Sequence, residues 1–244
     1  MLYIYPFITF GSVALNHYNL WADKEQADGV PMKNQNSAFG MGIGLGYRVQ
    51  YLELGIGFSA LYTSATSNWR EGNSNAHWNY TLKHRLLNFL IYLPIGLNYP
   101  LTDQFSVYFG VKPIMGFSNL SWYDSAYAYA MGFSSYGVID ASLSKSSFGL
   151  GFDFGGDFGF SRSFALYFRF GYDVINFKGY EGEYEERLSD GTRRTKLAYL
   201  VFDTDNNTLS VKDRPYDPSK GEIPGEENLS GFRFSLGIKV GIGR

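Results

Sequence analysis

The residues of this chain that could do chemistry are charged side chains set into strongly apolar stretches. Reading every second residue along those stretches places eight charges on one face: Glu53, Asp153, Asp157 and Asp173 with Lys112, Arg169, Arg233 and Lys239. Four acids and four bases in a confined interior must pair, because an unpaired buried charge costs on the order of several kcal/mol. The set therefore predicts an ion-pair network that plugs the interior. A selective conduit is the less favoured hypothesis, because narrow β-barrels are filled by side chains.

Arg169 is expected at the centre of one hairpin of this network. A tight turn at Ser161–Ser163 sets Gly155 opposite Arg169, with Asp153 and Asp157 on the two diagonals. A guanidinium can serve two carboxylates, so we expect Arg169 to hold both acids and to bond at least one directly.

Other patterns carry weaker chemical signals. His17, His77 and His84 are expected in or beside loops, and no spacing fixes a catalytic triad, so exposed loop residues are the favoured interpretation. Asp203–Asn207 resembles a calcium loop but lacks the glycine and the distal glutamate of an EF-hand, which favours a hairpin turn. With 0 Cys, thiol chemistry is excluded. We expect no catalytic residue, no metal site and no cofactor.

Aromatic residues cluster in two of the expected loops. They form a candidate partner-binding surface, or equally an aromatic belt at the level of lipid headgroups. The set is Trp69, Trp78, Trp122, Tyr123, Tyr127, Tyr129 and Tyr136.

The stretch from 38 to 63 predicts how these residues are positioned. Bulky apolar residues alternate with glycine, first over 39–47 and then, after a break at 48–50, over 52–62. A period of two indicates two strands joined by a tight turn. Glycine weakens a strand, so its use on one whole face predicts a cramped interior, with the bulky face turned outward into lipid.

The same pattern recurs along the chain and predicts eight strands. They lie near 3–15, 38–48, 51–63, 85–98, 105–118, 147–160, 164–177 and 231–243. Connections alternate between long and short, which is typical of an eight-stranded antiparallel up-and-down transmembrane β-barrel with short periplasmic turns and long extracellular loops. Within the last loop, Lys196–Asp203 and Thr208–Lys212 are expected to form a small hairpin, and Glu181–Glu226 is expected to be dispensable.

Composition bounds the class of protein. The 244 residues show no linker, so one all-β domain over 1–244 is expected. A net charge of −2 gives no electrostatic case for binding nucleic acid. No segment has a basic n-region followed by an apolar run and a cleavage site, so we expect a leader to have been removed and read residues 3–15 as a strand.

Three segments resemble outer-membrane proteins of Gram-negative bacteria. They are Phe89-Leu-Ile-Tyr-Leu-Pro-Ile-Gly-Leu97, Phe168-Arg-Phe-Gly-Tyr-Asp-Val174 and Ser235-Leu-Gly-Ile-Lys-Val-Gly-Ile242. The broad likeness is to OmpA- and OmpX-type eight-stranded barrels, and the narrower one is to the PorT-like barrel family of Bacteroidetes. The last segment resembles a barrel-assembly signal, although it has aliphatic Val240 and Ile242 where aromatics are usual and the chain ends on Arg244.

The fold and the resemblance together lead to one main hypothesis on function. We expect a non-enzymatic anchor in the bacterial outer membrane that displays its loops, in contact with lipid and lipopolysaccharide and with other outer-membrane or periplasmic proteins. One alternative, from the resemblance alone, is a subunit of a secretion or barrel-assembly complex. Another is a rim enzyme that modifies lipid or lipopolysaccharide. A soluble lipocalin-like barrel is disfavoured, because its bulky residues would have to lie inside.

Overall fold

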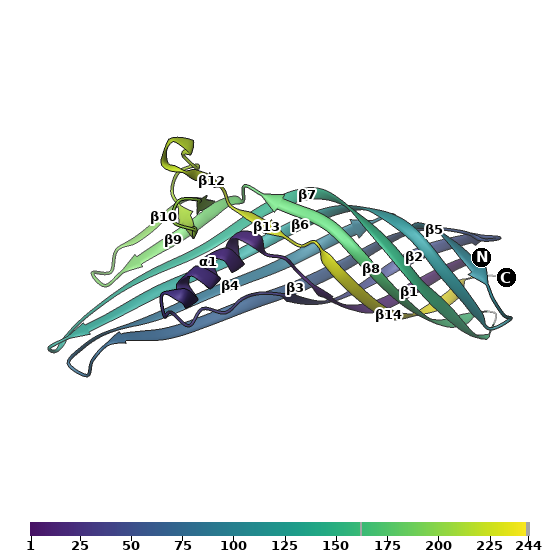
Figure 1. Ribbon diagram of the computed structural model, residues 1–244, viewed down its shortest axis with the longest axis horizontal. Helices are drawn as coiled ribbons and strands as arrows, with labels where there is room; N and C mark the ends of the chain where they lie inside the picture. The colour runs from purple at the N-terminus through teal and green to yellow at the C-terminus, as the bar shows by residue number, and fades with distance from the viewer. Residues whose placement is uncertain (162, 243–244) are drawn as a thin grey trace.

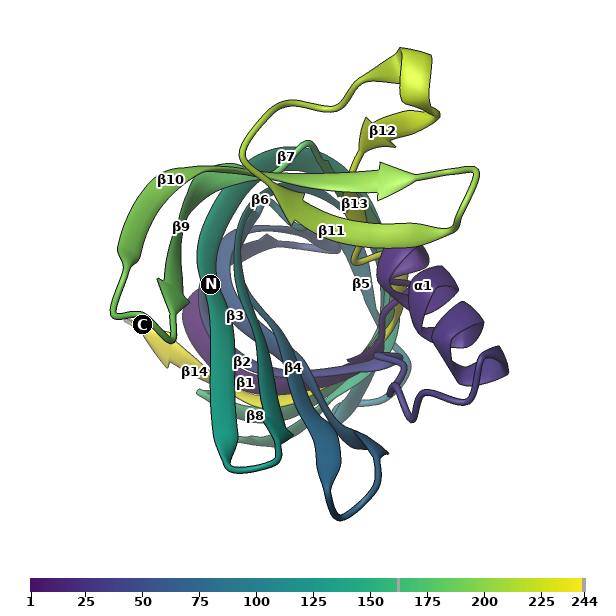
Figure 2. The ribbon, with the colours of Figure 1, turned by 90° about the vertical axis from the view of Figure 1, so that its left-hand side faces the viewer.

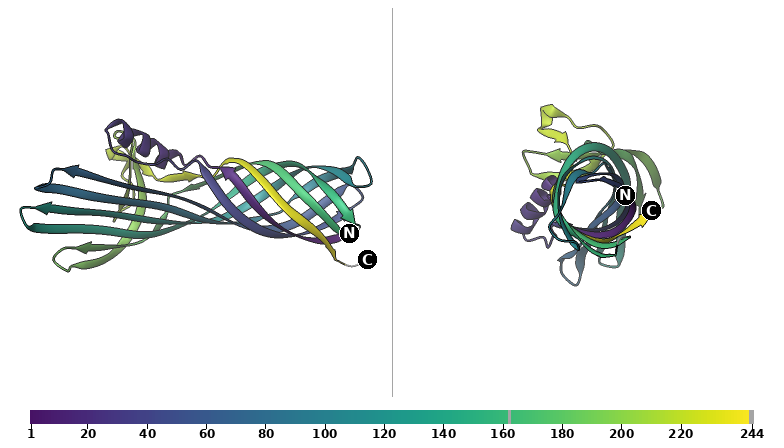
Figure 3. Two further views of the ribbon diagram at one scale, coloured as in Figure 1. Left: turned by 90° about the horizontal axis from the view of Figure 1, so that it is seen from below. Right: turned by 90° about the vertical axis from the view of Figure 1, so that its right-hand side faces the viewer.

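Eight strands pair into a closed ring. The computed structural model describes residues 1–161 and 163–242. Within them the ring consists of β1 (Leu2–Ser12), β2 (Ser37–Val49), β3 (Leu52–Gly72), β4 (Ala76–Tyr92) continued by β5 (Ile95–Pro100), β6 (Phe105–Ala130), β7 (Phe133–Ser161), β8 (Phe164–Lys178) and β14 (Gly231–Ile242). Each strand is antiparallel to its neighbours, and β1 pairs with β14 to close the ring. Figures 1 and 3 show the strands winding obliquely around one axis.

The expected turn at Ser161–Ser163 and the expected end of the last strand include residues 162 and 243, which lie outside the described residues. At the same end of the ring, β2 and β3 are joined by a tight turn in which Gln50 has a φ of 52°. Leu2 at the start of β1 pairs there with Ile242 at the end of β14. The long connections lie at the opposite end (Figure 1).

The glycine face of β2 is matched by aromatic rings on β1. Cross-strand pairs set each ring opposite one glycine: Tyr3 with Gly46, Tyr5 with Gly44 and Phe7 with Gly42. A methyl group on any of these glycines would overlap the paired ring. Aromatic side chains covering cross-strand glycines stabilise narrow curved sheets. The rings thus occupy the space that the missing side chains leave.

The opposite face of the ring is apolar and exposed. On β2 the outward residues are Phe39, Met41, Ile43, Leu45, Tyr47 and Val49, and all of them are exposed. Phe154 on β7 is 58% exposed and Phe170 on β8 is 53% exposed. We call the zone of outward apolar residues, which surrounds the ring, the apolar band.

Four strands continue far beyond the apolar band, where the sequence had predicted loops. The expected loops at 64–84 and 119–146 are instead the paired ends of β3 with β4 and of β6 with β7. At about 3.3 Å per residue, the 26 residues of β6 are roughly 85 Å long. Serine, alanine and asparagine dominate these segments, so local composition indicates loops, whereas cross-strand pairing decides for strands. Figure 1 shows them as two hairpins that project from one end.

We call the paired ends of β3 with β4 and of β6 with β7, residues 63–86 and 119–146, the extension. A cap made of segments distant in sequence packs on it. It consists of α1 (Asn16–Ala27), β9 (Glu181–Leu188), β10 (Arg193–Asp203), β11 (Thr208–Lys212), the 3-10 helix η1 (Pro218–Lys220), β12 (Glu222–Pro224) and β13 (Glu226–Asn228). The helix was not predicted. The expected β10–β11 hairpin is confirmed by its register. Figure 2, viewed from this end, shows α1 and the strands β9–β11 arranged around the rim of the ring.

The cap and the extension share one apolar core, which corrects the expectation that Glu181–Glu226 is dispensable. Tyr18 of α1, Leu200 and Phe202 of β10, and Leu229 are buried against Leu86 and Leu120 of the extension. Deleting the segment would uncover this core. It is therefore a structural part of the cap.

A methyl group added to an interior glycine tests how closely the aromatic side chains of β1 pack against the glycines of β2. We expect Gly44→Ala to lower the free energy of unfolding by about 1–3 kcal/mol, because the new Cβ overlaps the Tyr5 ring in a space with no room to yield. Gly159→Ala is the matched control, since its Cβ would have no neighbour closer than 3.7 Å. Urea unfolding of both variants in lipid vesicles measures the difference, and equal losses would contradict the packing described.

Candidate functional site

The interior charges form two groups, and the larger lies near the short-turn end. Glu53 of β3 and Asp157 of β7 share the ammonium of Lys239 on β14, with Nζ 2.9 Å from Glu53 Oε1 and 2.8 Å from Asp157 Oδ2. Arg169 of β8 lies 2.8 Å from Asp157, and Arg48 of β2 lies 2.9 Å from Glu53 and 2.7 Å from Asp157. Three cations thus surround two carboxylates contributed by strands on different sides of the ring.

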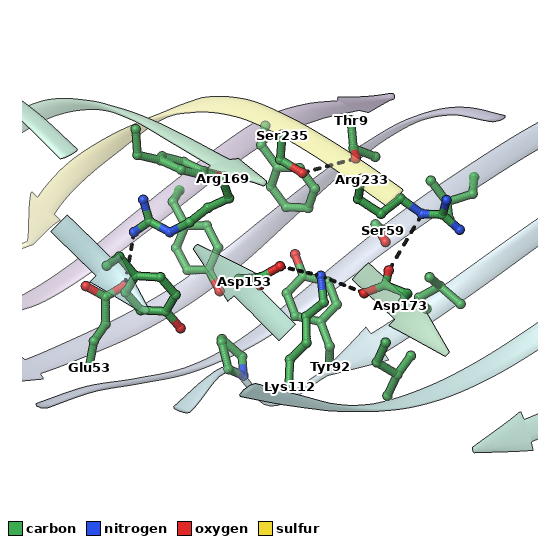
Figure 4. Close-up of a pocket in the computed structure, with 18 of the residues that line it drawn as sticks. Thr9, Glu53, Ser59, Tyr92, Lys112, Asp153, Arg169, Asp173, Arg233 and Ser235 are labelled. Atoms are coloured by element: carbon green, nitrogen blue, oxygen red, sulfur yellow. Dashed lines mark hydrogen bonds and ion pairs between the residues drawn. The ribbon is translucent and has the colours of Figure 1, made fainter. Parts of the chain in front are cut away.

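The second group lies nearer the extension. Lys112 of β6 places its Nζ 3.0 Å from Asp153 of β7 and 3.0 Å from Asp173 of β8. The guanidinium of Arg233 on β14 lies 3.6 Å from Asp173 and donates to the backbone carbonyls of Ser12, Phe232 and Leu229. Figure 4 shows these side chains converging from several strands.

The space left between the charged groups is small. A cavity of about 70 Å³ remains, lined by Tyr5, Tyr92, Tyr108, Tyr167 and the charged residues around them. That volume holds a few water molecules. The interior among the described residues is filled by side chains, as expected for eight strands.

The structure brings together all eight charges that the sequence places inside, and it adds Arg48. The sequence assigned Arg48 to the break between two strands, but its long side chain reaches inward from the end of β2. Asn98 of β5 was also missed, and its amide donates to both Glu53 and Asp157. Asn98 follows Leu97 in the strand alternation, so its inward phase was readable from the sequence.

One expected contact is wrong in detail. Gly155 faces Arg169 as the turn predicts. Arg169 pairs with Asp157, but Asp153 pairs with Lys112 instead. The guanidinium of Arg169 lies over the ring of Tyr108, with its centre 4.1 Å from the ring centroid. A cation over an aromatic face is held there electrostatically, and this contact with β6 accounts for the turn away from Asp153.

The seven aromatic residues predicted to form one surface lie on two opposite faces of the sheet. Trp122 is wrong as a partner-binding residue, because it is 3% exposed and stacks on Trp21 of α1 with centroids 5.3 Å apart. On the face that continues this core lie Trp69 and Trp78. On the opposite face are Tyr123, Tyr127, Tyr129 and Tyr136. The set therefore is neither one surface nor a belt at the edge of the apolar band.

Two of the three histidines are buried, which corrects the expectation of exposed loop residues. His84 is fully buried: its Nδ1 lies 2.8 Å from Gln35 Oε1 and its Nε2 lies 3.1 Å from Glu227 Oε1. His17 accepts a hydrogen bond at Nδ1 from the backbone N–H of Glu226. Sequence reasoning missed Glu227 and Gln35, because both lie in polar runs far from His84 in the chain. No hydroxyl nucleophile contacts His84 among the hydrogen bonds of the described residues.

The described residues contain no cluster of three or more histidine and acidic side chains suited to hold a metal ion. Asp203 accepts backbone hydrogen bonds from Asp205 and Asn206, as a hairpin turn requires. In the parts of the chain that the structure covers, the helices are too short and polar to cross a membrane.

Comparisons with known proteins are sparse. No family model and no curated protein sequence matches the chain. Among solved structures it is similar to the outer membrane protease OmpT from Escherichia coli, at 9% identity and a TM-score of 0.27, covering 98% of this chain and 94% of that one. So loose a superposition transfers no residue roles. The resemblance to the PorT-like family stays a prediction.

The structural match does correct one expectation. The sequence led us to expect a protein that is not an enzyme, whereas the solved structure found to be similar is that of a protease. The expectation of a non-enzymatic protein is therefore not retained.

The division of the charges into two groups predicts different coupling energies in two double-mutant cycles. We expect Arg169→Ala to lower the free energy of unfolding by roughly 3–5 kcal/mol, because it leaves Asp157 and Glu53 with less compensation in a closed interior. Arg169→Ala and Asp157→Ala should be strongly non-additive, whereas Arg169→Ala and Asp153→Ala should be close to additive. Equal coupling in both cycles, measured by urea unfolding in vesicles, would contradict the division into two groups.

The buried carboxyl of Glu227 predicts that the stability of the folded protein depends on pH. Burial raises the pKa of its carboxyl above the usual range, against the opposing pull of His84. A carboxyl whose pKa is higher in the folded state stabilises the fold while protonated, and that contribution is lost as pH rises through the folded pKa. Glu227→Gln should therefore become more stable relative to wild type as pH rises above about 4.3, the ordinary glutamate value. Denaturation of both proteins from pH 4 to 8 tests this, with Glu226→Gln as the neighbouring control; a constant difference would contradict it.

Proposed function

We propose that the chain is an integral outer-membrane β-barrel, plugged by its ion pairs, which anchors the extension and cap outside the bilayer and displays them to a partner. The single observation that carries this proposal is the inverted distribution of polarity. Nine interior charges, the eight predicted ones and Arg48, face one another across the ring, while the apolar band faces outward. Water would favour the reverse arrangement, whereas lipid favours this one.

The dimensions of the band support this proposal. On β2 the exposed apolar residues run from Phe39 to Val49. Eleven residues at about 3.3 Å each, tilted by about 45°, rise roughly 25 Å, which is the height of the apolar zone of outer-membrane barrels. Aromatic pairs mark its edges, with Phe10 against Phe39 at one end and Tyr51 against Tyr99 at the other. Rings at these levels fit the interfacial girdles of such barrels.

The closed ring supports a membrane-spanning role for physical reasons. Unpaired backbone groups are costly in lipid, so strands can cross a bilayer only where every edge is paired. Here β1 pairs with β14 and β7 pairs with β8, so no edge of the band is left free among residues 1–161 and 163–242. The even strand number and the antiparallel order support a bacterial outer membrane as the proposed location.

The display part of the proposal is supported by the size and order of the extension. The strands do not end at the edge of the band but continue as a sheet, packed by α1 and β9–β13 around a core of its own. A plugged barrel with a rigid external platform is suited to hold a binding surface at a distance from the membrane. A role as a subunit of a secretion or assembly complex would be one form of this display.

One charge on the outward face tests the membrane assignment. We expect Phe154→Arg to weaken insertion by about 2–4 kcal/mol, because the guanidinium would face the middle of the bilayer. Tyr127→Arg, at a position of the extension that is 42% exposed, is the control and should insert normally. Folding into vesicles is followed by the heat-modifiable mobility of the barrel and by protection of band peptides from protease. A wild-type chain that stays soluble and fails to insert would refute the proposal.

A further inference from the structure

The far end of the β6–β7 hairpin is uncharged and exposes large apolar side chains. From Ser125 to Val138 the chain has no charged residue. Met131 and Phe133 at the tip are 87% and 82% exposed. Met131 and Gly132 have φ angles of 48° and 86°, which lie in the left-handed region. Met131 therefore occupies a turn position where asparagine or glycine is usual. An exposed apolar tip on an ordered hairpin is typical of a binding surface.

The tip is continuous with an apolar patch on the sheet. The inward face of the extension is buried as far as Leu82 and Trp122, where Trp21 of α1 stacks. Beyond it lie six side chains on the same face of β4, β6 and β7: Trp78, Tyr80, Ala126, Ala128, Ala130 and Phe133. We call this patch the distal face; Figure 2 looks onto this end of the molecule. Asp124 and Glu71 border it.

Large and small residues lie directly beside one another on the distal face. Trp78 pairs with Ala128, Tyr80 with Ala126, and Phe133 with Ala130. The alanines of β6 thus form a row between the aromatic residues of β4 and β7. A second copy related by a two-fold axis would present its aromatic residues to the alanines of the first.

We propose that the distal face is an interface between two copies of this chain, held together outside the membrane. The proposal deepens the display function above and rests on it. The chain from Ser125 to Val138 carries no charge, and the two acids Glu71 and Asp124 lie at the border of the distal face, so a second copy would bring like charges together only at the rim. Anchoring in one bilayer would further raise the local concentration of copies.

Two other occupants fit less well. A surface that binds lipid headgroups usually carries lysine or arginine to meet anionic lipid, and the hairpin from Ser125 to Val138 has neither. A strongly charged partner protein would find only Glu71 and Asp124 at the rim, and no charge between Ser125 and Val138. The exposed parts of Trp78 and Phe133 alone would remove on the order of 500 Å² from water in a pair of copies, which approaches half of the smallest specific interfaces.

Single cysteines test the arrangement in the intact chain, which has no cysteine of its own. Ala128→Cys lies on the distal face, and Ser125→Cys lies on the opposite face of the same strand, so the two are matched. Both proteins are reconstituted in phosphatidylcholine vesicles, oxidised, and analysed on non-reducing gels. We expect at least tenfold more disulfide-linked dimer for Ala128→Cys. Equal cross-linking of both, or none for Ala128→Cys, would overturn the proposal.

Removing the rings provides a second measurement that does not depend on cysteine. In detergent, the dimer dissociation constant should rise at least tenfold for Trp78→Ser with Phe133→Ser and stay unchanged for Tyr127→Ser on the opposite face. Raising salt from 50 to 500 mM should change it less than twofold, because no ion pair is involved. A wild-type chain that stays monomeric at 50 μM, or whose tip binds empty vesicles instead, would refute the interface.

The two proposals fail in different ways in the same samples. Heat-modifiable mobility and protease protection report insertion of the barrel, independently of cross-linking. A chain that inserts but gives no specific dimer would overturn only the interface. A chain that does not insert would overturn the membrane assignment itself.

Discussion

Eight paired strands enclose room for little more than a single layer of side chains, and this constraint shapes the rest of the molecule. Where β1 contributes rings, β2 must contribute glycine, because a methyl group would overlap Tyr3, Tyr5 or Phe7. Where charges enter, they must come in compensating numbers and contact one another at once. The interior therefore has little freedom, and its stability depends on exact pairing between strands on different sides of the ring.

The interior charges also help to hold the ring of strands closed. Lys239 on the last strand contacts Glu53 on β3 and Asp157 on β7, so one ammonium joins three sectors of the ring. Arg233, two positions into the same strand, is tied to the backbone carbonyl of Ser12 at the end of β1. Both contacts involve the last strand, and the one from Arg233 lies where the first and last strands meet. They supplement the backbone ladder between β1 and β14, which Pro6 cannot fully join because it lacks an N–H.

Beyond the apolar band the fold is stabilised by a conventional apolar core instead of by a charged interior. The extension is a curved sheet with one face covered by α1 and by strands from the last long connection. Buried polar groups such as His84, Gln35 and Glu227 find partners on three separate segments. The cap is thereby held on the extension, and the part of the sheet that it leaves uncovered is the distal face.

The sequence by itself determined the ring: the period of two, the glycine face and the alternation of long and short connections are local signals, since side-chain direction in a strand follows from position alone. It also placed the eight interior charges, because their phase within each strand is fixed in the same way. Tertiary structure decided how they pair, since Arg169 turns from Asp153 toward Asp157 in response to Tyr108 on another strand. It decided too that 64–84 and 119–146 are strands, that α1 forms, and that Trp122 and His84 are buried. These outcomes depend on contacts between distant segments, which no local pattern encodes.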